Sequence, residues 1–162
     1  MLGFRKIAKN EIEAKLDAEC ELLKKSLSKD SDSSIAAKAI YIDYGLGALD
    51  RFREDLQLDF STESIKRVEE RLSVMHDQMT EAQPSTDAID GFVKLFGGYI
   101  GCVMMQTGWE WGVDGNNPLD LSKVVVERNG KRFYILSKIY KRLMNGSEDN
   151  IWDAYYIIEQ MK

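Results

Sequence analysis

The hydrophobic pattern of this chain changes its period near Thr107, and this change restricts the fold more than any other feature. Before that point apolar residues recur every three or four positions, which is typical of amphipathic helices. From Trp109 to Val113 they alternate with Glu110 and Gly112, which is typical of a strand with one buried face. The chain is therefore expected to combine a helical part with a smaller sheet, the α+β class.

Four helical segments are expected before the change of period. They cover approximately residues 3–28, 33–56, 61–79 and 87–107. Ser33 or Ser34 is expected to cap the second segment and Ser61 the third, because a serine oxygen accepts a hydrogen bond from a free N–H of the first turn. Two glycines, each costing a helix about 1 kcal/mol, leave residues 40–44 open between helix and strand.

The dipeptide Asn129-Gly130 stands between two β-rich runs and predicts a tight hairpin turn. The expected strand pairs are Arg128–Lys131, Glu127–Arg132, Val126–Phe133, Val125–Tyr134 and Val124–Ile135. With the tryptophan strand they form a three-stranded antiparallel meander. Two further helices are expected to begin at Ser137 and Ser147. We expect one domain over residues 1–162, with helices in 1–107, the sheet in 109–136 and two helices in 137–162.

The composition favours a globular domain without a metal or disulfide staple. A chain of 162 residues buries roughly 70% of its unfolded surface. Cys20 and Cys102 have no CxxC spacing, so we expect two buried free thiols. The first residues lack the apolar run of a signal peptide, and the longest apolar run, residues 95–105, is too short to cross a bilayer. A cytoplasmic protein with no cofactor and no membrane contact is expected.

The sequence offers little for catalysis or for metal binding. His76 is the only histidine, and no G-x-S-x-G motif accompanies it. The loop 114–120 resembles the start of an EF-hand, but Leu119 and Val125 stand where that motif needs glycine and glutamate. We therefore expect no metal site, and an enzyme is disfavoured.

Gly97 and Gly101 form a GxxxG pattern inside the fourth helical segment. Glycine in a helix costs stability, so a close approach of another element should offset it. The same feature has a second interpretation, a cleft between this helix and the tryptophan strand. The residues of that alternative cleft are Gly97, Gly101, Trp109, Glu110, Trp111 and Glu127.

Charge is distributed unevenly along the chain, although the net charge is −5. Residues 59–90 contain eight acids and three bases, whereas residues 122–144 contain seven bases and one acid. The two segments could face each other within the fold, or the basic segment could bind an acidic partner, or the acidic segment a basic one. Nucleic acid is disfavoured because the isoelectric point is about 5.0 and no recognisable module is present.

Several motifs together resemble a family of small bacterial domains with no assigned activity. They are DFSTESIKRVEERL from Asp59, FGGYIGCVM from Phe96, GWEW from Gly108 and YKRLMNGSEDNIWDAYY from Tyr140. The resemblance covers the chain from Leu58 onward and implies a bacterial origin. It supplies no catalytic residues. Cys102 departs from the pattern, because a polar or acidic residue is expected after Gly101, and this departure argues against a polar site there.

We therefore expect a non-catalytic bacterial domain that binds a protein partner through a charged face, of the inhibitor, immunity or adaptor type. The candidate acidic residues are Glu63, Glu69, Glu70 and Asp77, and the candidate basic residues are Arg128, Lys131, Arg132, Lys141 and Arg142. The alternative is a small-ligand-binding protein or an enzyme that uses the cleft between the Gly97–Gly101 helix and the Trp109–Trp111 strand. There Lys141 or Arg142 would hold an anion, and Glu110 or Glu127 would act as a base.

Overall fold

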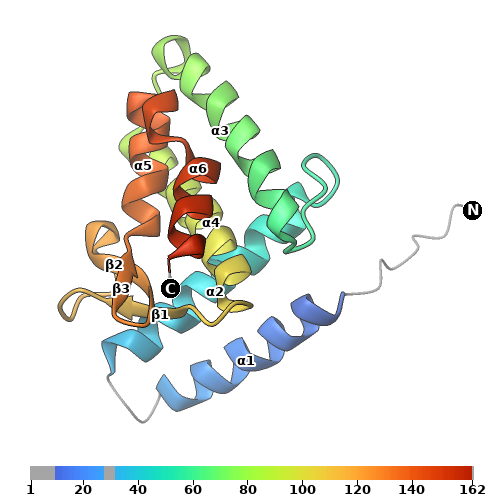
Figure 1. The fold of residues 1–162 in the computed structure, drawn as a ribbon, viewed down its shortest axis with the longest axis vertical. Coiled ribbons are helices and arrows are strands. Elements are labelled where there is room, and N and C mark those ends of the chain that lie inside the picture. The colour runs from blue at the N-terminus through green and yellow to red at the C-terminus, as the bar shows by residue number, and fades with distance from the viewer. Residues whose placement is uncertain (1–9, 28–31, 162) are drawn as a thin grey trace, which may run out of the picture.

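A computed structural model describes residues 10–27 and 32–161, which form six α-helices and one sheet (Figure 1). The helices are α1 (Glu11–Leu27), α2 (Ser33–Phe52), α3 (Thr62–Ala82), α4 (Thr86–Met105), α5 (Ile135–Asn145) and α6 (Ile151–Gln160). The strands are β1 (Glu110–Val113), β2 (Val124–Arg128) and β3 (Lys131–Phe133), with short 3-10 turns at Leu121–Lys123 and Ser147–Asp149. The predicted α+β class is confirmed: four helices precede an antiparallel meander and two helices follow it.

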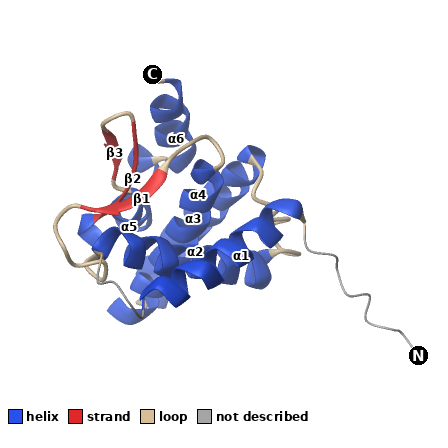
Figure 2. Cartoon of the chain, turned by 90° about the horizontal axis from the view of Figure 1, so that it is seen from below, coloured by secondary structure: helices blue, strands red, loops and turns tan. Residues whose placement is uncertain are grey.

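Helix α4 forms the centre of the core, and α2, α3 and α5 each contact it. Every residue from Phe96 to Met104 is buried. Composition and length alone would let α4 cross a membrane, yet 56% of its most apolar stretch is buried inside the fold. Its apolar character is explained by its central position. In Figure 2 the small sheet lies to one side of the helices.

Helices α2 and α4 pack closely where Gly45 of α2 meets Gly98 of α4. A Cβ atom built on Gly98 would lie 2.6 Å from the carbonyl oxygen of Tyr41, and one built on Gly45 would lie 2.8 Å from the carbonyl oxygen of Gly98. The two backbones are therefore in direct contact, which no residue with a side chain would allow. This contact also explains why residues 40–44, left open between helix and strand, are helical: Tyr41 and Ile42 are buried in the core.

The sheet has the order β1-β2-β3, with both neighbours antiparallel. The predicted hairpin is confirmed through the pair Val126–Phe133, with Asn129 and Gly130 at φ of 53° and 76° in the turn. The predicted pairs Val125–Tyr134 and Val124–Ile135 are wrong, because β3 ends at Phe133 and α5 begins at Ile135. Residues from Ile135 onward are helical because a helix buries four apolar side chains on one face, namely Ile135, Leu136, Ile139 and Leu143.

Several helix ends differ from those expected. Asp32 caps α2 in place of Ser33 or Ser34, and its carboxylate accepts hydrogen bonds from the N–H groups of Ser34 and Ile35. The predicted cap at Ser61 is confirmed. Helix α5 begins two residues before Ser137, and Ser147 opens a 3-10 turn. Asn150 caps α6 by accepting a hydrogen bond from the N–H of Asp153. The expected start of the first helix, residues 3–9, lies outside the described residues.

Candidate functional site

The alternative cleft beside Gly97 and Gly101 is occupied by side chains of the protein itself. A Cβ atom on Gly101 would lie 2.1 Å from Cζ2 of Trp111, and one on Gly97 would lie 2.2 Å from Cδ2 of Leu136. The indole of Trp111 is buried and stacks on Tyr41, with ring centroids 5.4 Å apart. The structure therefore shows tight packing at the place where the alternative hypothesis puts a ligand.

The remaining residues of that cleft lie on different sides of the sheet. Trp109 is buried, and its indole N–H donates to the Glu159 carboxylate over 3.0 Å. Glu110 and Glu127 are directly opposite each other in the β1–β2 pairing. Glu110 is exposed and lies 3.5 Å from the amine of Lys38, whereas Glu127 lies 2.7 Å from the guanidinium of Arg132. Each carboxylate thus has its own cationic neighbour, and neither is placed in an enclosed site.

Two of the candidate partner-binding residues are buried against each other. The Nε–H of Arg142 on α5 donates to both carboxylate oxygens of Glu69 on α3, over 2.7 and 2.9 Å. The Glu69 carboxylate also accepts a hydrogen bond from the N–H of Ile151, at the start of α6. Only 7% of Glu69 and 2% of Arg142 is exposed. The prediction that Glu69 and Arg142 belong to an exposed binding face is therefore wrong. The two residues connect α3, α5 and α6 inside the fold.

Two of the other basic candidates, Arg128 and Arg132, form ion pairs with acids of the same chain. Arg128 donates to the Glu159 carboxylate over 2.6 Å, and its guanidinium lies 4.6 Å from the centre of the Trp109 ring. Arg132 lies between Glu127 and Asp114. The predicted cross-strand pair Glu127–Arg132 is confirmed. Lys131 is half-buried, and Arg132 and Lys141 are exposed. Lys141 lines a cavity of about 400 Å³ whose wall includes the acids Asp90 and Asp120.

The acidic candidates other than Glu69 lie on the solvent side of α3. Glu63, Glu70 and Asp77 follow one another at intervals of seven residues, so they share one helix face. Glu63 lies 3.3 Å from the amine of Lys66, one turn away. Glu70 and Asp77 make no ion pair with any described residue. Val74, between them in sequence, is 51% exposed. We call Glu63, Glu70 and Asp77 the acidic face.

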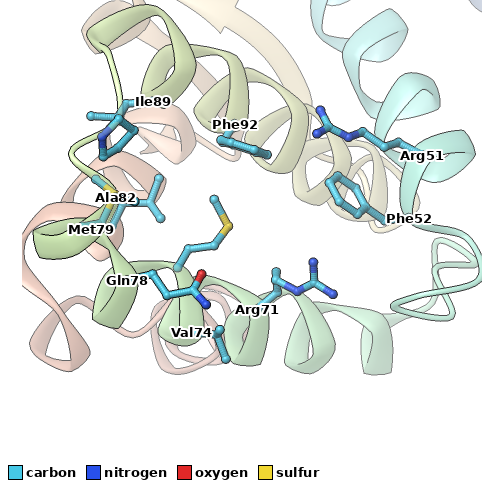
Figure 3. Close-up of a pocket in the computed structure, with 12 residues that line it drawn as sticks. Arg51, Phe52, Arg71, Val74, Gln78, Met79, Ala82, Ile89 and Phe92 are labelled. Carbon is cyan, nitrogen blue, oxygen red and sulfur yellow. The ribbon is translucent and has the colours of Figure 1, made fainter.

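An open apolar groove lies beside this acidic face, and the sequence interpretation did not anticipate it. The groove has a volume of about 610 Å³ and is walled by α2, α3 and α4, with Leu143 of α5 also lining it (Figure 3). Its apolar lining consists of Phe52, Val74, Met75, Met79, Ala82, Pro84, Ile89, Phe92 and Leu143. Its polar lining consists of Arg51, Arg71 and Gln78. We call this feature the α3 groove.

Arg51 and Arg71 lie at the same end of the α3 groove, on opposite walls, with the Phe52 ring between them in the view of Figure 3. The Cζ atoms of Arg51 and Arg71 lie 5.1 and 5.9 Å from the centre of the Phe52 ring, and Arg51 lies 5.3 Å from the ring of Phe92. Neither guanidinium pairs with a carboxylate of the described residues. The sequence signal for this site was weak, because the two arginines are 20 positions apart and belong to different helices.

The single histidine bonds to a backbone carbonyl, and the two cysteines are buried in the fold. The Nδ1 atom of His76 lies 2.6 Å from the carbonyl oxygen of Leu143, and since a carbonyl only accepts, the ring nitrogen donates. Burial raises the pKa of the Cys102 thiol well above its usual range, and burial also raises the pKa of Cys20. Both thiols are free. Within residues 10–27 and 32–161, no three metal-ligating side chains gather as a cation site requires.

No protein-family model matches the chain, and neither the curated proteins nor the solved structures compared with it show a significant similarity. The resemblance to a bacterial family, the bacterial origin and the cytoplasmic location therefore stay predictions. The acidic face and the α3 groove are the candidate binding surfaces of the described residues.

Proposed function

We propose that this chain is a non-catalytic domain that binds a protein partner through the acidic face of α3. The observation that carries the proposal is the unequal fate of the two charged segments. Arg128, Arg132 and Arg142 of the basic segment form ion pairs within the chain, whereas Glu70 and Asp77 are exposed and form no ion pair with the residues that the structure describes.

The geometry of α3 suits a flat, basic partner surface. Unpaired carboxylates attract a positively charged protein over about a Debye length and steer its approach. Val74, exposed between Glu70 and Asp77, supplies an apolar contact at the centre of the same face. Interfaces commonly combine an apolar centre with a charged rim. This arrangement supports an inhibitor, immunity or adaptor role for the domain.

The experiment compares protein capture by the native chain and by two charge-reversed double variants. Glu70→Lys/Asp77→Lys changes the acidic face, whereas Glu54→Lys/Glu148→Lys makes the same change in net charge at two exposed acids elsewhere. A partner should be retained by the native chain and by the Glu54/Glu148 variant and lost by the Glu70/Asp77 variant. For that partner, the association rate should fall at least tenfold on reversal at low salt, because steering is electrostatic.

Two results would count against this function. One is a partner that binds both double variants equally. The other is an association rate that responds neither to salt nor to the reversals at Glu70 and Asp77. In each case circular dichroism should first confirm that the variants are folded.

A further inference from the structure

We propose that the α3 groove binds a long-chain carboxylate, with the alkyl chain along α3 and the carboxylate group held by Arg51 and Arg71. This inference is independent of the protein-binding role, because the lining of the groove includes none of Glu63, Glu70 and Asp77, and only Val74 lies next to both surfaces.

The body of the α3 groove has the size and chemistry of a site for one alkyl chain. A volume of about 610 Å³ falls within the range of small-molecule sites, roughly 300–1,000 Å³. The part of α3 that lines it runs from Arg71 to Ala82, about 16 Å at the α-helical rise per residue. The unbranched side chains of Met75 and Met79 adapt readily to a flexible apolar ligand. A whole helix, about 10 Å across, would fill this volume less well than an extended chain.

The two ends of the α3 groove differ in polarity, which gives the ligand a direction. Arg51, Phe52 and Arg71 are at one end, and Met79, Ala82 and Ile89 are at the other (Figure 3). An amphiphile with one charged group matches this asymmetry when the charge lies at the arginine end. A ligand charged at both ends would have to leave one charge on the apolar wall.

The arginine pair selects an anion, and its fork geometry favours a carboxylate. The guanidinium groups of Arg51 and Arg71 lie 5.1 and 5.9 Å from the centre of the Phe52 ring, and neither forms an ion pair with a carboxylate of the described residues. Each guanidinium can therefore donate paired N–H bonds to a carboxylate at this end of the groove. Stacking on Phe52 and Phe92 keeps the guanidinium planes oriented before the ligand arrives. The amide of Gln78 can add one more donor to the wall.

The test is calorimetric titration of the full chain with octanoate, decanoate and dodecanoate, each kept below its micelle concentration. We expect one molecule to bind per chain. Affinity should rise by roughly fourfold for each added methylene that is buried. Dodecyltrimethylammonium, which has the same chain and a cationic head, should bind at least tenfold more weakly than dodecanoate.

The matched variants are Arg51→Gln and Arg71→Gln, with Arg132→Gln on the β-hairpin as the control. Each groove variant should weaken dodecanoate binding about tenfold, the loss expected for a charge-assisted hydrogen bond, while the control keeps the native affinity. A further variant, Met79→Glu, places a charge on the apolar wall and should abolish binding of the alkyl chain. Because Met79 is partly exposed, the fold should survive the change.

Several outcomes would overturn this inference. The first is the absence of saturable dodecanoate binding to the native chain. The second is an equal affinity for dodecanoate in the native chain, in Arg51→Gln and in Arg71→Gln. The third is an equal affinity for dodecanoate and dodecyltrimethylammonium, which would show that the arginines do not favour an anionic head group over a cationic one. Displacement of bound dodecanoate by the protein partner of the acidic face would leave the ligand assignment intact, whereas failure to find such a partner would affect only the protein-binding role.

Discussion

The six-membered part of the Trp111 indole occupies the space directly above Gly101, where any other residue would place its Cβ atom. This contact joins β1 to α4 and holds the sheet against the helices. An alanine at position 101 would put its methyl carbon 2.1 Å from Cζ2 of the ring. The ring is itself held by stacking on Tyr41, so it has little room to move.

We therefore predict that Gly101→Ala lowers the free energy of unfolding by about 3 kcal/mol, at the upper end of the usual cost of overpacking. Gly91→Ala in the same helix is the matched control, because no atom lies within 4 Å of its added Cβ. That variant should raise the free energy of unfolding by about 0.5–1 kcal/mol through helix propensity. Urea unfolding measures both. Equal stability of Gly101→Ala and the native chain would contradict the packing described here.

The buried pair Glu69–Arg142 predicts a large cost for removing one partner. Arg142→Met leaves the Glu69 carboxylate buried without its cation, which should cost about 3–5 kcal/mol. Arg132→Met, which breaks the half-exposed pair with Glu127, should cost less than about 1 kcal/mol. Thermal and urea unfolding of the two variants give the comparison. Similar costs at the two sites would show that burial does not strengthen the Glu69 contact.

Tyr99 predicts a loss of stability at alkaline pH. Its hydroxyl accepts hydrogen bonds from the N–H groups of Asp59 and Phe60, and it lies 2.7 Å from the Oγ of Ser64. Burial raises the pKa of Tyr99 from its ordinary value of 10.0 to about 12. Burial raises the pKa of Tyr41 to about 12 as well.

A raised pKa in the folded state means that the folded chain holds the phenol proton more tightly than the unfolded chain does. Stability from this source is complete below pH 10 and is lost as the pH rises toward 12. Urea titrations from pH 9 to 12 should show the decline, and Tyr99→Phe should make it shallower. That variant should also cost about 2–4 kcal/mol at neutral pH, because two backbone N–H groups lose their acceptor. An unchanged slope in Tyr99→Phe would assign the decline to other groups.

The two cysteines are expected to be unreactive while the chain is folded. Both thiols are buried, and burial raises the pKa of each, which disfavours the reactive thiolate. Iodoacetamide at pH 8 should modify neither Cys20 nor Cys102 in the native protein and both in denaturant, as mass spectrometry can measure. A cysteine introduced at the exposed position Glu54 is the positive control. Rapid modification of Cys102 in the folded chain would show that the α4 core opens readily.

The sequence was sufficient to predict the kinds of element and their order. Hydrophobic period and turn chemistry are local properties, so the pattern from Ile65 to Met79 predicted α3, and Asn129-Gly130 predicted the hairpin. Errors were confined to element ends. At Ile135 the apolar run fits a strand and a helix equally well over a few residues, and burial of the α5 face decided between them.

The candidate site was far less predictable, because it depends on which surfaces meet. Glu69 and Arg142 are separated by 73 positions, and only their burial shows that they belong to the core. Arg51 and Arg71 reach the same aromatic ring only because the end of α2, which carries Phe52, lies beside α3. The chain by itself determined the helices, the hairpin and the excess of acids over bases in residues 59–90. Tertiary structure alone decided which charges are neutralised and where an open groove remains, since both depend on contacts between distant residues.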